Sequence, residues 1–310
     1  MGFPRRHFLT VFLLGLAGIW ALPARATEKE GMPDLAQVDQ TCFPTAAGNL
    51  MVWFGHNGYP NLIASGDSED ERDLHTIHLI MGDTDASFYK GTRQSKLTLG
   101  IQKFVRDAGY DADVEYRGLD YGSPDEKVPL PLTEDWLYGN DDPNKGYILL
   151  FSYCMFHPDA NCYTDVMGIG HAVTLVNAEP GLMLIHDPAH DSSETGRKIL
   201  TPTVITSGDW RERGFSAPVT GLMLVSGSLL EAPFNSQVML TGAICVTMHP
   251  PASTKPAAPA VPSGEASPNI AGSAPGAAPA SAPAAPKPDA SNRSWLGWFL
   301  DLFFGGSPKK

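Results

Sequence analysis

Apolar residues recur every three to four positions in three segments of the N-terminal half, a spacing typical of amphipathic helices. The first segment begins near Cys42 and ends at Gly55 or Gly58. The second covers residues 67–82 and the third residues 95–108, before Gly109. The sequence therefore predicts three helices early in the chain.

The pattern then changes to alternating and short continuous apolar runs, separated by Pro, Gly and Asp clusters, which is typical of strands. These runs cover residues 112–116, 147–153, 172–176, 182–187, 220–225 and 238–248. Helices first and antiparallel strands afterwards predict an α+β fold.

Residues 1–26 have the pattern of a secretory signal peptide: a basic start, an apolar run over residues 11–22 and Ala24-Arg25-Ala26 as a cleavage site. The run is too short for a membrane-spanning helix. Arg5-Arg6 and the residues after them also fit the twin-arginine export signal, and an ordinary secretory signal with two arginines is the alternative. We therefore expect a bacterial protein that is periplasmic or extracellular and whose mature form begins at Thr27.

Composition divides the rest of the chain. Residues 27–249 have a globular composition, whereas residues 250–293 form a Pro/Ala/Ser-rich stretch that cannot bury a core and is predicted to be a disordered linker. Residues 294–310 crowd aromatic and aliphatic side chains into a segment too short to cross a bilayer. This tail predicts contact with a membrane surface or with another envelope protein, and folding back onto the domain is the alternative.

The formal net charge is −12, and removal of Arg5, Arg6 and Arg25 with the signal peptide takes it to −15. A chain this acidic, without a basic stripe, is a poor nucleic-acid binder. We therefore expect no nucleic-acid partner.

Cys42 is a candidate nucleophile because it stands where the first helix begins. The positive end of the helix dipole favours a thiolate, which is the reactive form of cysteine. A nucleophilic cysteine also needs a base, and the base needs a partner that orients it. A turn at Glu179-Pro180-Gly181 joins two predicted strands and brings His171 nearly opposite Asp187. The hairpin therefore predicts a base and its orienting carboxylate.

These segments resemble the papain-like cysteine peptidases, and most of all the bacteriocin-processing (double-glycine leader) peptidase family with its stand-alone extracellular relatives. The resemblance spans residues 32–248 and lies in CFPTAAGN, GHAVTLV and the Asp-Pro pair, although Phe43 stands where the family commonly has glycine. It implies a papain-like α+β fold: N-terminal helices with the nucleophile, followed by an antiparallel sheet carrying His and Asp.

The resemblance also implies the reaction, which is hydrolysis of a peptide bond in a peptide or protein substrate, without a cofactor. The implied catalytic residues are the nucleophile Cys42, the base His171, the orienting Asp187 and the oxyanion donor Gln37. Gln40 competes with Gln37 for the last role. The alternatives are another acyl transfer by the same residues, such as deamidation or transpeptidation, a catalytically silent binding module, and a structural envelope protein that acts through its tail.

The four cysteines leave a second interpretation open. Cys154 and Cys162 bracket a short polar loop that a disulfide could close. With Cys42 as nucleophile, Cys245 would be a buried free thiol in an apolar strand. In the alternative, Cys42 and Cys245 form a second disulfide and no nucleophile remains.

A metal site is the weaker alternative for the polar residues near Asp187. His186, Asp187 and His190 lie within HDPAHD, but Pro188 breaks the helical spacing that would place them on one face. His75 and His78 lie on the second predicted helix and are expected at its surface or at the edge of the core. The sequence therefore predicts no metal.

Overall fold

The computed structural model describes residues 28–87, 94–119, 130–189, 197–212, 214–227 and 236–250. The predicted signal peptide, the aromatic tail and all but the first residue of the predicted linker lie outside these residues.

In the described part of the chain the three long helices come first, as the sequence predicts. They are α1 (Cys42–His56), α2 (Glu69–Asp83) and α3 (Gln94–Asp107), and the short α4 (Glu134–Leu137) follows later. Three 3₁₀ turns are η1 (Pro60–Leu62), η2 (Tyr138–Asp141) and η3 (Pro158–Ala160). Every residue of α1 from Phe43 to Gly55 is buried, so the helix that begins with Cys42 is enclosed on all sides.

The strands form one sheet that includes a closed ring. They are β1 (Ala112–Gly118), β2 (Lys145–His157), β3 (Cys162–Glu179), β4 (Leu182–His186), β5 (Arg197–Val204), β6 (Asp209–Glu212), β7 (Phe215–Pro218), β8 (Met223–Gly227) and β9 (Gln237–Met248). Strand β2 pairs with both β3 and β9, which closes an antiparallel barrel of six strands in the order β2-β3-β4-β5-β8-β9. Strand β1 extends the sheet from β9, and β6 pairs in parallel with the start of β3.

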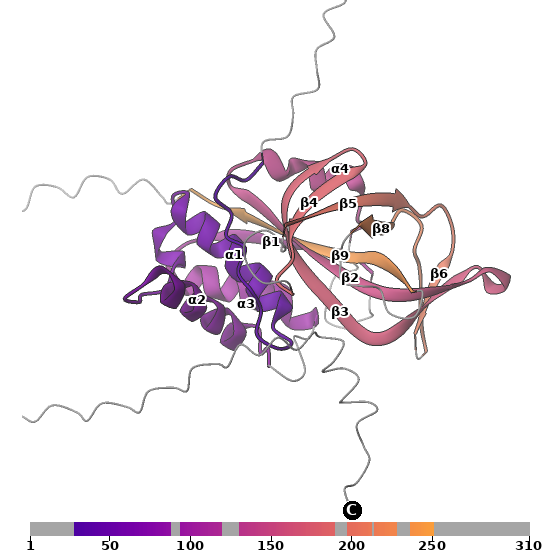
Figure 1. The fold of residues 1–310 in the computed structure, drawn as a ribbon, viewed down its shortest axis with the longest axis horizontal. Helices are drawn as coiled ribbons and strands as arrows, with labels where there is room; N and C mark the ends of the chain where they lie inside the picture. The colour runs from indigo at the N-terminus through magenta and orange to yellow at the C-terminus, as the bar shows by residue number, and fades with distance from the viewer. Residues whose placement is uncertain are drawn as a thin grey trace, which may run out of the picture. The chain divides into compact units, whose positions relative to one another are not determined.

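Two apolar clusters explain why this arrangement holds together. One cluster draws on all six barrel strands and fills the barrel. The other joins α1, α2 and α3 to the outer side of the barrel wall. Strand β2 serves both, because Tyr147, Leu149 and Phe151 face the first cluster while Ile148 and Leu150 face the second. Helices α1–α3 accordingly gather on one side of the strands (Figure 1).

The predicted papain-like α+β fold, with helices followed by an antiparallel sheet carrying His and Asp, is wrong for this structure. The strands close a barrel, which the prediction lacked, and Asp187 lies in a turn after β4 rather than on a strand. Barrel closure requires strands to bend, and β-bulges bend them. Strand β2 carries such register shifts at Leu150/Phe151 against β9 and at Ser152/Cys154 against β3.

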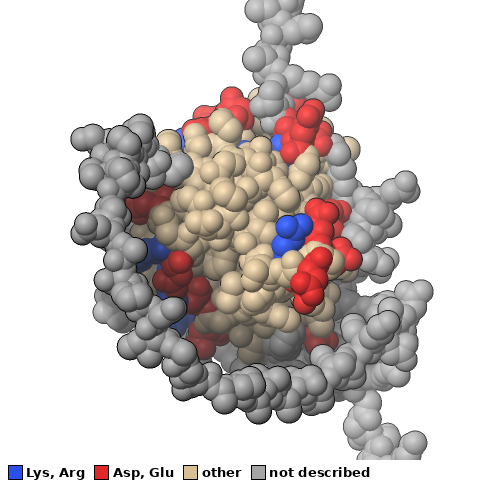
Figure 2. Space-filling view, turned by 90° about the vertical axis from the view of Figure 1, so that its left-hand side faces the viewer, with Lys and Arg blue, Asp and Glu red and all other residues tan. Residues whose placement is uncertain are grey.

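The helical side of the molecule is acidic at its margins. In the view that faces the left-hand side of Figure 1, a wide uncharged area is bordered mostly by Asp and Glu (Figure 2).

None of the described helices is long and apolar enough to cross a membrane.

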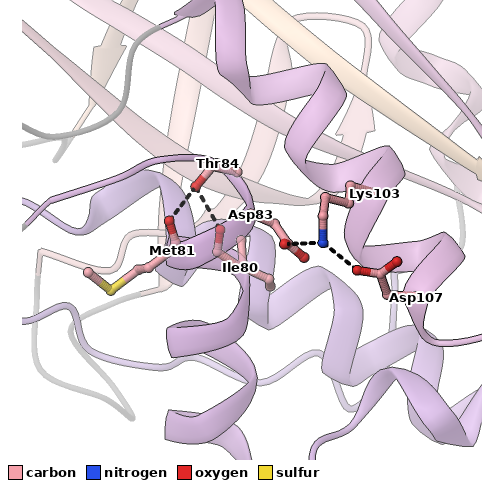
Figure 3. Close-up of polar contacts among 6 residues, drawn as sticks. All are labelled: Ile80, Met81, Asp83, Thr84, Lys103 and Asp107. Atoms are coloured by element: carbon pink, nitrogen blue, oxygen red, sulfur yellow. Dashed lines mark hydrogen bonds and ion pairs between the residues drawn. The ribbon is translucent and has the colours of Figure 1, made fainter.

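Helices α2 and α3 approach each other closely where α2 ends. Thr84 donates a hydrogen bond to the carbonyl of Ile80 at 2.7 Å, and Lys103 of α3 forms ion pairs with Asp83 and Asp107 (Figure 3). A Cβ atom on Gly100 would lie 2.5 Å from the Thr84 Cγ2 and 2.7 Å from the Thr84 Cα. Only glycine fits at Gly100 without movement of the backbone.

We predict that Gly100→Ala destabilises the protein by about 1–3 kcal/mol, the usual cost of overpacking. The clash outweighs the roughly 1 kcal/mol that alanine gains over glycine in a helix interior. Gly82→Ala is the matched control, because nothing lies within 4 Å of its added Cβ. Denaturant unfolding of both variants tests this, and equal stabilities would contradict the close approach.

Candidate active site

Cys42 is the first residue of α1, as predicted from the sequence. The loop before it is fixed by Thr41, whose hydroxyl donates to the Val38 carbonyl at 2.7 Å and accepts from the Val38 N–H at 3.1 Å. The first turn of α1 carries no acidic residue. The field of the helix N-terminus therefore acts on the half-buried Cys42 thiol without a competing carboxylate on the same turn.

His171 lies on β3 and Asp187 follows the end of β4, and the two side chains meet. The His171 Nε2 lies 2.7 Å from the Asp187 Oδ1, and both side chains are buried. The same Asp187 oxygen accepts a hydrogen bond from the Ala189 N–H at 3.0 Å. Thr174 pairs with His186 across the β3–β4 ladder, so Asp187 reaches His171 diagonally from the turn rather than from directly opposite.

The structure also brings Cys42 to His171. The Cys42 sulfur lies close enough to the His171 side chain and to the backbone N–H groups of Ala172 and Phe43 for each of them to lower its pKa. Because the Nε2 of His171 is occupied by Asp187, the Nδ1 is the ring nitrogen left for the thiol. Cys42, His171 and Asp187 therefore form one continuous chain of contacts, assembled from a helix, a strand and a turn.

This arrangement favours a charged sulfur and a charged ring. Burial by itself would raise the pKa of Cys42, but the hydrogen bond and positive charge of His171, with the two backbone N–H groups, lower it overall. Burial likewise opposes the charged form of His171, yet Asp187 and Cys42 raise its pKa to about 10. Both shifts favour the pair of thiolate and imidazolium over the pair of neutral groups.

The predicted oxyanion donor Gln37 is placed near the site but is engaged elsewhere. Its side-chain Nε2 donates to the Asp39 carbonyl at 2.7 Å, and its backbone N–H donates to the Pro188 carbonyl at 2.7 Å. Gln40, its competitor for that role, is half-buried. The oxyanion role of either glutamine stays a prediction.

The predicted disulfide between Cys154 and Cys162 is not formed in this structure, where all four cysteines are free thiols. In the β2–β3 ladder Cys154 pairs with Asp165, while Cys162 pairs with His157. The two cysteines are therefore offset by three ladder positions, or roughly 10 Å along the strands. A disulfide needs Cα atoms closer than about 7 Å. The alternative Cys42–Cys245 bond is not formed either, and Cys245 lies with the cluster that fills the barrel.

The alternative metal site does not assemble among the described residues, which hold no cluster of three or more His, Cys, Asp or Glu placed to bind an ion. The Nδ1 of His186 instead lies 2.9 Å from the Pro33 carbonyl. His190 lies outside the described residues. His75, on α2, is exposed with its Nδ1 3.1 Å from the Ser65 carbonyl.

Three further residues lie near Cys42, His171 and Asp187, and the sequence did not predict them as neighbours of this site. Tyr153 is buried on β2, and its pKa is raised by burial and by the charges of Asp187 and Cys42. Asp34 has both carboxylate oxygens buried without a hydrogen bond, and burial raises its pKa. The sequence pattern indicates His186 only as a metal ligand. Asp34 and Tyr153 lie far from Asp187 in sequence, which left no local signal to find them.

The comparisons with known proteins add little to this geometry. No protein-family model matches the chain, and no curated protein matches it. Among solved structures, the chain is similar to the Pseudomonas avirulence protein AvrPphB, with 13% sequence identity and a TM-score of 0.22. The match covers 50% of this chain and 74% of that chain. At this level the likeness does not bear on the activity.

We predict that a small haloacetamide alkylates Cys42 at a pH well below the ordinary thiol range, which is centred near 8.5. The reaction rate should rise with pH through the lowered pKa of Cys42 and then stay level, because the thiolate persists after His171 loses its proton. His171→Ala should move this rise toward the ordinary range. Cys245, whose pKa is raised by burial, is the internal control. A Cys42 profile equal to that of an ordinary thiol would contradict the ion pair.

Proposed function

We propose that the protein is an exported cysteine peptidase that hydrolyses peptide bonds through Cys42, His171 and Asp187. The observation that carries this proposal is the unbroken chain of contacts from the thiol at the start of α1 to the buried carboxylate of Asp187. A nucleophile with a lowered pKa, beside a base with an orienting carboxylate, is the arrangement that covalent acyl transfer requires.

The reaction would proceed in two halves. The Cys42 thiolate attacks the carbonyl carbon of the substrate, and the carbonyl oxygen becomes negative. The imidazolium of His171 gives its Nδ1 proton to the amine nitrogen, the C–N bond breaks, and a thioester remains on Cys42. Neutral His171 then takes a proton from water, whose oxygen attacks the thioester. The acid product leaves, and the thiolate and imidazolium are restored.

Asp187 and the start of α1 supply the electrostatic support. The Asp187 carboxylate fixes the ring of His171 and stabilises its positive charge. The backbone N–H of Cys42 belongs to the first turn of α1, where N–H groups have no partner within the helix, so it is available to a developing oxyanion. Gln37 could act as a second donor once its amide releases the Asp39 carbonyl.

The resemblance of the Cys42 and His171–Asp187 segments to the bacteriocin-processing peptidases supports the same class of reaction. It rests on CFPTAAGN, GHAVTLV and the Asp-Pro pair, and it supports cleavage of a peptide bond in a peptide or protein substrate. Phe43, in place of the glycine common in that family, is the specific observation that favours the alternative of a silent binding module.

The location of the protein belongs to the same proposal. The export signal in residues 1–26 would bring the chain to the periplasm or the cell exterior. The aromatic segment 294–310 would then hold the catalytic domain at a membrane surface, with residues 250–293 as a tether. Both segments lie outside the described residues, so their sequence alone supports this part.

We predict that Cys42→Ala and His171→Ala each abolish peptide hydrolysis to a similar extent, because the groups of a triad act as a unit. Asp187→Asn should leave partial activity, because Asp187 orients His171 and does not react. Release of new amino termini from a casein digest measures this, with His78→Ala on the exposed side of α2 as a control. Hydrolysis that survives Cys42→Ala would rule out the mechanism, and a wild-type chain without hydrolysis would favour the silent binding module.

For the tail, we predict that the full-length chain sediments with anionic liposomes and that a chain ending at Asn292 does not. The aromatic side chains would enter the interface while Lys309 and Lys310 reach the headgroups. Sedimentation in high salt separates the two contributions, since salt screens only the lysines. Equal sedimentation of both chains would remove the membrane role.

A further inference from the structure

Residues 29–37 form a coil segment with a turn at residues 30–31, which touches both halves of the candidate site, and we name it the N-terminal strap. It begins on β3, where the Lys29 N–H donates to the Val176 carbonyl at 3.3 Å. It ends at the turn that carries Asp187, where the Gln37 N–H donates to the Pro188 carbonyl at 2.7 Å. The segment between these points is coil or turn, so none of its contacts belongs to a regular ladder.

The strap holds the Asp187 turn from both sides. On one side of Asp187, the Nδ1 of His186 lies 2.9 Å from the Pro33 carbonyl, and His186 is buried. On the other side is the bond from Gln37 to Pro188. A carbonyl oxygen only accepts, so the Nδ1 of His186 carries the hydrogen in this contact. The residues before and after Asp187 are therefore both tied to the strap.

The strap also holds α1, the helix that begins with Cys42. The Leu35 N–H donates to the Asn49 Oδ1 at 3.0 Å, and the Trp53 Nε1–H donates to the Glu30 carbonyl at 3.1 Å. The Lys29 ammonium lies over the Trp53 ring, 4.1 Å from its centroid. The same short segment thus connects the helix of the nucleophile to the turn of the orienting carboxylate.

Asp34 lies within the strap, but it makes no hydrogen bond to the Asp187 turn. It lies between the two anchors, its carboxylate oxygens have no hydrogen bond, and burial together with the charge of Asp187 raises its pKa. The charge of His186 acts in the opposite direction. Asp34 makes no hydrogen bond to the turn, so the directional hold on the turn falls to His186 and to the backbone bond of Gln37.

We propose that His186 is a positioning residue, which sets the place of the Asp187 carboxylate by fastening the turn to the strap. This inference rests on the proposed function, because it concerns the same triad. His186 does not touch the reacting atoms; it acts through Asp187 and then through His171. Without the His186–Pro33 contact, Asp187 would hold His171 less firmly, and less of the Cys42 thiolate would form.

The test compares His186→Ala with His186→Asn in the full-length chain. Alanine removes the donor, whereas the asparagine amide can still donate to the Pro33 carbonyl. His75→Ala is the matched control, because it removes a histidine–carbonyl contact of similar length, the His75–Ser65 contact on the exposed side of α2. The readouts are the rate of Cys42 alkylation at mildly acidic pH, kcat and KM for a peptide substrate, and circular dichroism for folding.

His186→Ala should lower both the alkylation rate and kcat by roughly 10- to 100-fold, because a misplacement of about 1 Å costs on the order of a hundredfold. KM should stay near the wild-type value, since binding of the substrate is not affected. His186→Asn should recover most of the loss, and His75→Ala should behave as wild type. If His186→Ala unfolds, a folded His186→Asn variant with wild-type alkylation still supports the role of the donor.

Two outcomes would overturn the inference: wild-type alkylation in a folded His186→Ala variant, or a folded His186→Asn variant as slow as His186→Ala. The alkylation readout separates this inference from the proposed function. Suppose that the wild type hydrolyses no peptide, but that its Cys42 is alkylated quickly and His186→Ala slows this alkylation. The positioning role of His186 is then supported, and the proposed peptidase function is contradicted. If the wild type hydrolyses peptides and His186→Ala has the same alkylation rate and kcat, the proposed peptidase function is supported and the positioning role of His186 is contradicted.

Discussion

The hydrogen bond between the His171 Nε2 and the Asp187 Oδ1 is the contact on which the candidate site depends, and the barrel is what holds its two ends. A slip of one residue in β3 would turn the side chain of His171 to the opposite face of the sheet. Strand β3 cannot slip easily, because it pairs with β2 along one edge and with β4 and β6 along the other. The register of His171 is therefore determined several times over.

The position of Cys42 depends on a second constraint, the packing of α1 against the same strand. The buried hydroxyl of Thr174 donates to the Ala46 carbonyl at 2.8 Å, which fixes α1 along β3. Ala172 and Val176 of β3 lie in the apolar cluster that contains α1. Strand β3 therefore carries His171 and also fixes the position of the N-terminus of α1 along the strand. One strand therefore positions His171 relative both to Asp187 and to the start of the helix that carries Cys42.

Local signals explain what could be predicted from the sequence. The start of α1 at Cys42 follows from helical periodicity, and the nearness of His171 to Asp187 follows from one hairpin with a short turn. Barrel closure could not be predicted in this way, because it joins β2 to β9, which lie far apart in the chain. Strand β5 contains Pro202, and proline is disfavoured within a strand, so the alternation of apolar and polar residues did not predict β5. The strap could not be predicted, because its contacts are made by coil residues and backbone carbonyls, which leave no periodic pattern in the sequence.

The balance of charge explains why the site combines these parts. A thiolate, an imidazolium and a carboxylate together carry one net negative charge, and Asp187 is fully buried. Burial of an uncompensated charge is costly, so nearby dipoles must stabilise it. The Ala189 N–H supports Asp187, while the N–H groups of Ala172 and Phe43 and the start of α1 support the sulfur. Asp34 has no such donors, and burial raises its pKa, so its charged form is disfavoured where it lies. The donors are thus distributed over the three elements that bring Cys42, His171 and Asp187 together, so loss of any one element would remove both a side chain and part of its electrostatic support.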